Sequence, residues 1–74
     1  MKTVTVWAGG KSRAKYPLIE IEHYIRWDGE RDGWMAYTWH KGRRNFLQSM
    51  DDSVADDLIR RHLDSGNRIA QRES

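Results

Sequence analysis

Four side chains in the middle of the chain have the types that metal-independent ribonucleases use. They are Tyr37, His40, Arg43 and Arg44. Cations and acid–base groups of this kind can stabilise a pentacovalent phosphate during RNA cleavage. Their spacing is equally that of an exposed hairpin, and nothing in the sequence fixes their mutual geometry. We therefore keep a metal-free ribonuclease as the third of three hypotheses and expect a protein that is not an enzyme.

Other patterns that could carry chemistry are incomplete. Gly10-Lys11-Ser12 matches the end of a P-loop, but the position of its first glycine holds Thr5 and no helix is expected to follow. Glu20 and Glu22 lie about 7 Å apart on one face of an expected strand. A chain this small offers no deep cleft for an acid–base pair, so we expect these carboxylates to pair with Lys or Arg across the sheet.

The chain holds no set of residues that predicts a metal or a cofactor. It has no cysteine, and its three histidines, His23, His40 and His62, are far apart with no short ligand spacing. We expect His23 to be a hydrogen-bonded residue within the sheet. No cofactor and no metal ion is predicted.

The composition is that of a polar chain with an aromatic centre. Of the 74 residues, 38% are hydrophobic and 32% are charged, and the mean hydropathy is −0.92. The aromatic residues all lie between Trp7 and Phe46, which argues against disorder. There is no apolar run of the roughly 20 residues that a membrane span needs. No apolar run follows Lys2 as in a secretory signal, so a cytoplasmic location is expected.

The hydrophobic pattern changes its period once along the chain. Alternation predicts strands over residues 2–7, 18–27, 34–40 and, more weakly, 44–49, with a glycine loop over 8–17. Lys41-Gly42 fits a hairpin turn. From Val54 to Leu63 the apolar residues follow one helical stripe, and Gly66 fits the helix exit. Residues 67–74 are polar, and we expect them to be frayed or weakly helical.

These elements predict a small α+β fold. Its antiparallel sheet of three to four strands packs against one C-terminal helix, in the order β-loop-β-β-β-α. We expect a single domain over residues 1–66 and a polar C-terminal tail over 67–74. Few residues can be buried, so the core must be thin, and a partner or a second copy in a homodimer could cover part of the surface.

Positive charge is concentrated in the first fifty residues, which carry a net charge of +4, whereas residues 51–74 carry −2. The basic residues form two clusters. If both clusters lie at one end of the sheet, they form a positive rim beside exposed aromatics, which suits a phosphate backbone with stacked bases. Nucleic-acid binding is therefore the second hypothesis. The clusters are Lys11, Arg13 and Lys15 in the glycine loop, and Lys41, Arg43 and Arg44 at the hairpin.

One stretch supports the nucleic-acid hypothesis by analogy. Gly33-Trp34-Met35-Ala36 and then Gly42-Arg43-Arg44 precede the expected helix. The segment from Gly33 to Leu63, less than half of the chain, resembles the sheet-then-helix arm-binding modules of tyrosine recombinases. The resemblance implies a sheet whose strands can enter a DNA groove.

The first hypothesis is a stand-alone, non-enzymatic protein-binding module, an inhibitor or an adaptor. Trp, Tyr and Arg most often anchor protein interfaces, and the chain is rich in them. In size and general character it resembles the small inhibitors that phages and mobile elements encode, anti-CRISPR and other anti-defence proteins among them. The expected partner-binding residues are Trp34, Trp39, Lys41, Arg43, Arg44, Lys11, Arg13 and Lys15.

Overall fold

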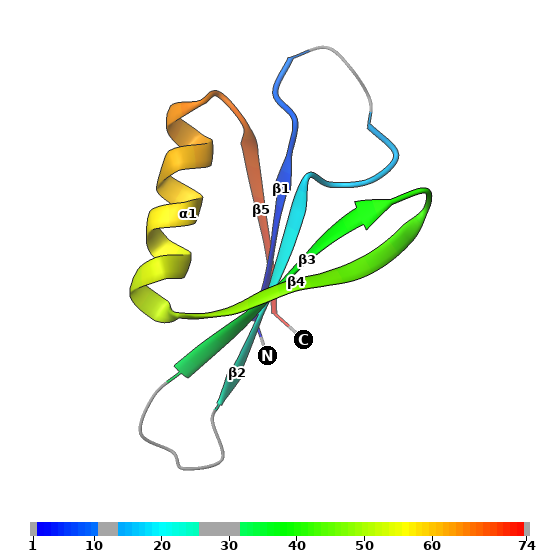
Figure 1. Ribbon diagram of the computed structural model, residues 1–74. Helices are drawn as coiled ribbons and strands as arrows, with labels where there is room; N and C mark the ends of the chain where they lie inside the picture. Colours follow the sequence, from blue (N-terminus) through cyan, green and yellow to red (C-terminus); the bar gives the residue numbers. More distant parts are fainter. Residues whose placement is uncertain (1, 11–13, 26–31, 74) are drawn as a thin grey trace.

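The computed structural model describes residues 2–10, 14–25 and 32–73 (Figure 1). Five strands form one antiparallel sheet in the order β4-β3-β2-β1-β5, and one helix lies near the C-terminus. The α+β fold is therefore confirmed, with five strands in place of three or four. The elements are β1 (Lys2–Trp7), β2 (Ile19–Ile25), β3 (Asp32–His40), β4 (Arg43–Asp51), α1 (Asp52–Asp64) and β5 (Arg68–Glu73).

The C-terminal segment differs from its expectation. The frayed or weakly helical conformation predicted for residues 67–74 is wrong, because Arg68–Glu73 form β5 and pair with β1. In this register Val6 lies opposite Ile69 and Val4 opposite Gln71. An edge strand that packs only one side chain against the core shows no alternation of apolar residues, and its sequence therefore reads as a polar tail.

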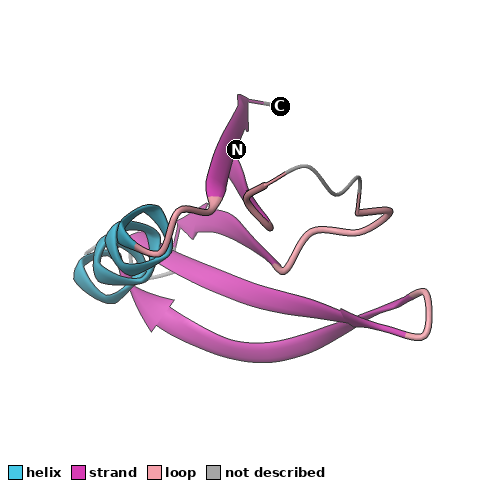
Figure 2. Ribbon diagram, turned by 90° about the horizontal axis from the view of Figure 1, so that it is seen from above, coloured by secondary structure: helices cyan, strands magenta, loops and turns pink. Residues whose placement is uncertain are grey.

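The core lies between α1 and one face of the sheet. Among the residues whose burial is described, alternation in the strands places seven buried side chains on this face, and α1 adds Ala55. Figure 2 shows α1 on one side of the sheet and the β3–β4 hairpin extending away from it. We call the opposite side, which α1 does not cover, the open face. The buried strand residues are Val4, Val6, Ile19, Ile21, Trp34, Ala36 and Met50.

The hairpin that joins β3 to β4 turns at Lys41-Gly42, as the sequence predicts. Both residues have positive φ, 51° and 77°, which is the requirement of a two-residue type I′ turn. Further along β4 the register shifts between Ala36 and Tyr37 of β3, so that Leu47 has no partner. This bulge bends the outer strand of the hairpin.

Two polar contacts hold the ends of α1 against the sheet. At its start, Trp34 Nε1 donates to Asp52 Oδ1 at 2.7 Å. At its exit, Gly66 has the expected left-handed conformation, with φ of 85°. The Asn67 side chain then accepts from the Gly9 amide at 3.4 Å. The helix therefore begins beside β3, and the chain that leaves it lies beside the segment that follows β1. Between these points α1 contacts β3, β4 and β5.

α1 is the one helix in the described part of the chain. With 13 residues, it is shorter than the roughly 20 residues that a bilayer requires. None of the described residues forms a helix that could span a membrane.

Candidate binding surface on the open face

Arg44 lies on the open face, near the hairpin end of the edge strand β4. Its guanidinium pairs with Glu20 at 3.0 Å and also with Glu22, both on β2. On the way it passes over the ring of Tyr37 on β3, 3.6 Å from the ring centre. The expectation that the two glutamates pair with a cation across the sheet is therefore confirmed. One side chain of β4 thus links three strands on this face.

Two pairs of aromatic rings lie on the same side of the hairpin as this arginine. Tyr16 and Trp39 stack with centres 4.9 Å apart and an interplanar angle of 17°. Tyr37 meets Phe46 edge to face at 5.9 Å. Of these two residues, Phe46 belongs to the edge strand β4, and it is 60% exposed. We call these four rings, with Arg44, the hairpin surface.

A basic rim borders the hairpin surface. Lys15 Nζ lies 5.6 Å from the centre of the Tyr16 ring. The same ring lies against the hairpin turn, because a Cβ added to Gly42 would be 3.3 Å from the Tyr16 hydroxyl. The glycine loop and the hairpin therefore meet at one end of the sheet. We call the exposed residues Lys15, Lys41 and Arg43 the basic rim; Arg43 lies at the hairpin end but points to the side opposite Arg44. Lys11 and Arg13 lie outside the described residues.

Acidic residues gather at the other end of β4. Asp51 closes the strand, and Asp52 and Asp56 follow in the first turns of α1. A strand of nine residues separates them from the rim by roughly 30 Å. The molecule therefore has a positive end, where β3 and β4 join, and an acidic end, where α1 begins.

The expectation that Trp34 is an exposed anchor is wrong. It is only 6% exposed, its indole donates to Asp52, and its ring packs edge-on against His23 at 5.0 Å. Both faces of β3 carry aromatic residues, so the sequence alone does not tell which face the helix covers. Trp39 lies on the open face, where it stacks on Tyr16.

Three of the rings were not among the expected anchors, namely Tyr16, Tyr37 and Phe46. Tyr16 stands in a segment without periodicity, and only the fold brings it to Trp39. Tyr37 and Phe46 alternate with apolar neighbours, as core residues also do. The sequence signal that could have pointed to exposed rings was that the chain has more aromatic residues than a thin core can bury.

The proposed ribonuclease residues do not meet in one place. Trp39 pairs with Arg44, and His40 pairs with Arg43. Since side chains alternate along strands, His40 and Arg43 lie on the opposite side of the hairpin from Tyr37 and Arg44. Within residues 2–10, 14–25 and 32–73, no three His, Cys, Asp or Glu side chains are grouped so as to hold a metal ion.

Comparison of the chain with protein-family models, with curated proteins and with solved structures finds no match. The interpretation of the hairpin surface therefore depends on its geometry and chemistry alone.

Proposed function

We propose that this protein is a protein-binding module that contacts its partner with the hairpin surface and the basic rim. It acts by occupying a surface of that partner, as an inhibitor or an adaptor does. The observation that supports this function best is Phe46, a ring 60% exposed beside Tyr37, in a cluster that also contains Trp39 and Arg44. Tyr, Trp and Arg dominate the binding energy of protein interfaces.

The shape of the hairpin supports the same conclusion. Residues 43–49 of β4 are exposed along their whole length, and Leu47, at the bulge, is 52% exposed. A projecting strand with two adjacent large apolar side chains is costly in water unless a partner covers it. The basic rim beside it favours a partner whose surface combines an apolar pocket with acidic residues.

The open face suits a protein better than a nucleic acid. Stacked bases need free ring faces, but Tyr16 and Trp39 cover each other and Arg44 covers Tyr37. In addition, Glu20 and Glu22 share a single guanidinium. Two carboxylates against one cation would repel a phosphate backbone that crossed this part of the face.

Photo-crosslinking tests the proposal. Phe46 is replaced by a benzophenone amino acid, which keeps an aromatic side chain, and the protein is irradiated in nuclease-treated extract of the cells that make it. A matched control carries the same group at Asp56, an exposed position on α1. We expect one protein adduct of defined mass from position 46 and none from position 56.

The basic rim supplies the second arm of this experiment. Excess unlabelled wild-type protein should suppress the adduct, whereas a folded K41E/R43E variant should suppress it at least about tenfold less well, because reversed charges oppose an acidic partner. Absence of an adduct, equal labelling from position 56, or equal competition by the variant would each overturn the proposed binding surface.

Nucleic-acid binding remains a second candidate because of the basic rim itself. Lys15, Lys41 and Arg43 lie at one end of the molecule, and the acidic first turn of α1 lies at the other. Binding of this kind would depend on the rim alone and would weaken steeply with salt. Retardation of labelled single-stranded RNA or duplex DNA at about 50 mM salt that K41E/R43E abolishes would support this candidate, and its absence would remove it.

A further inference from the structure

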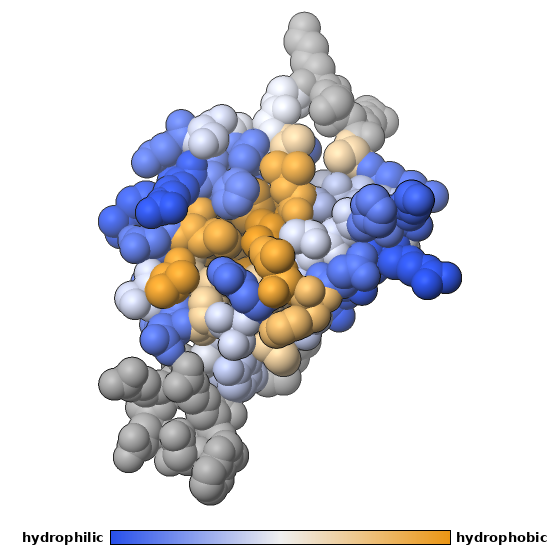
Figure 3. All heavy atoms as spheres, viewed as in Figure 1, coloured by the Kyte–Doolittle hydropathy of each residue, from blue (hydrophilic) through white to orange (hydrophobic). Residues whose placement is uncertain are grey.

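On the face opposite the hairpin surface, α1 leaves part of the sheet uncovered. Five strands spaced about 4.8 Å apart make a sheet roughly 20 Å wide, whereas a helix with its side chains is about 10 Å across. Because the β3–β4 hairpin extends away from α1 (Figure 2), the uncovered part lies between the helix and this hairpin. Figure 3 shows hydrophobic residues gathered there, between the polar outer side of α1 and the polar hairpin.

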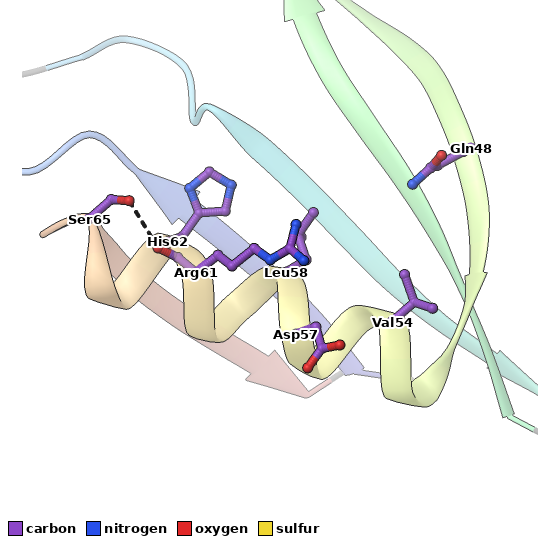
Figure 4. A pocket seen from close by; sticks show the side chains of 7 residues that line it. All are labelled: Gln48, Val54, Asp57, Leu58, Arg61, His62 and Ser65. Carbon is purple, nitrogen blue, oxygen red and sulfur yellow. Dashed lines mark hydrogen bonds between the residues drawn. The ribbon is translucent and has the colours of Figure 1, made fainter.

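A groove runs along this border, with a volume of about 440 Å³. Val54, Leu58 and His62, four residues apart on α1, form one wall, and Gln48 of β4 faces them (Figure 4). Val54 is 46% exposed although it belongs to the apolar stripe of the helix. Asp57 and Arg61 of α1 and Ser65, which follows the helix, also line the groove. The groove is therefore lined by two apolar side chains, Val54 and Leu58, among polar ones, and it carries one charge of each sign.

We propose that this groove binds α1 of a second copy of the chain, in a dimer with twofold symmetry. A twofold axis near the middle of α1 sets the two helices antiparallel and brings the two Leu58 side chains together. It also places Asp57 of each copy beside Arg61 of the other. The charge pattern of the groove edge is thus complementary to itself, as an isologous interface requires.

The size of the core supports the same partner. Within the part of the chain that the structure describes, eight residues form the buried cluster, which is a small core for that number of residues. A second helix laid beside α1 removes Val54 and Leu58 from water in both copies at once. An interface of one helix and one groove is below the standard of roughly 800 Å² per partner, so we expect a dissociation constant of about 10–100 µM.

Charge reversal separates this interface from other modes of association. In a dimer of Asp57→Arg, the arginine at position 57 of each copy lies beside Arg61 of the other. In a dimer of Arg61→Asp, the aspartate at position 61 of each copy lies beside Asp57 of the other. Each variant alone should dimerise at least about tenfold more weakly than wild type. An equimolar mixture of the two variants restores opposite charges across the axis, so we expect a heterodimer. Sedimentation velocity across concentrations that bracket the expected constant measures both effects.

The neighbouring pair on α1 provides the matched control. Asp56 and Arg60 have the same types and spacing, are exposed, and do not line the groove. Asp56→Arg and Arg60→Asp should leave the wild-type association unchanged. For every variant, urea unfolding at a protein concentration below the expected dissociation constant tests whether the monomer is folded.

Three outcomes would overturn the dimer. They are a folded wild type that stays monomeric throughout, a dimer that persists equally in Asp57→Arg, and a mixture of variants that does not associate. The inference does not depend on the proposed function, because the hairpin surface lies on the other face of the sheet. Lys41 and Arg43 do not line the groove, so K41E/R43E should dimerise as wild type does, whatever the crosslinking experiment shows.

Discussion

The guanidinium carbon of Arg44 lies 3.6 Å from the centre of the Tyr37 ring while the same group pairs with Glu20 and Glu22. The arginine belongs to β4, the tyrosine to β3 and the glutamates to β2. A ring and two carboxylates therefore hold one cation across three strands. Because residues 43–49 of β4 are otherwise exposed, this contact joins the hairpin surface to the rest of the sheet.

Arg44→Met should lower the free energy of unfolding by about 1–2 kcal/mol. The substitution removes a cation–π contact and leaves two carboxylates without their cation. Arg43→Met is the control, since Arg43 is exposed at the hairpin turn, and it should change stability by less than about 0.5 kcal/mol. Urea unfolding measures both. Equal losses in the two variants would contradict the central role of Arg44.

Trp34 and Asp52 should be energetically coupled. Trp34→Phe keeps most of the buried ring but removes the indole that donates to Asp52, and Asp52→Ala removes the acceptor. Each should cost about 1–2 kcal/mol, and a double-mutant cycle should give a coupling energy of about 1 kcal/mol. Strictly additive losses would mean that this hydrogen bond does not anchor the start of α1.

Gly9→Ala should destabilise the protein by about 2 kcal/mol or more. The added Cβ would lie 2.0 Å from the carbonyl oxygen of Gly66, and backbone on both sides leaves no flexible group to move aside. At Gly10 a Cβ meets nothing within 4 Å, and the φ of 94° is the only obstacle. Gly10→Ala should therefore cost less, about 1 kcal/mol. Thermal unfolding ranks the two variants. A larger loss of stability in Gly10→Ala than in Gly9→Ala would contradict the close approach of Gly9, just after β1, to Gly66 at the helix exit.

Ending the chain after Asn67 should abolish most of the native stability. The truncation removes β5, so that Val4 and Val6 lie on a new unpaired edge and Ile69 no longer packs against the core. Far-UV circular dichroism and amide chemical-shift dispersion report the loss. Deletion of Ser74 alone is the control and should leave both signals unchanged. A truncated chain as stable as the full one would restore the interpretation of residues 67–74 as a tail.

Local patterns in the sequence determined most of the elements. Alternation of apolar residues marked β1 and the interior strand β3, the helical stripe marked α1, and Lys41-Gly42 marked the hairpin turn. These features depend on neighbours within a few residues of each other, because burial of one face repeats with the period of the element. They also sufficed for the fold class.

Only the tertiary structure decided what these elements meet. The pairing of β5 with β1 joins Val6 to Ile69, and the contact of Arg44 with Glu22 spans 22 residues. The tertiary structure also decided that Trp34 is buried beside the helix while Trp39 lies on the open face, stacked on Tyr16, since two faces rich in aromatics look alike until one is covered. Periodicity tells which residues share a face, but the choice of the buried face depends on contacts between distant segments, which no local pattern contains.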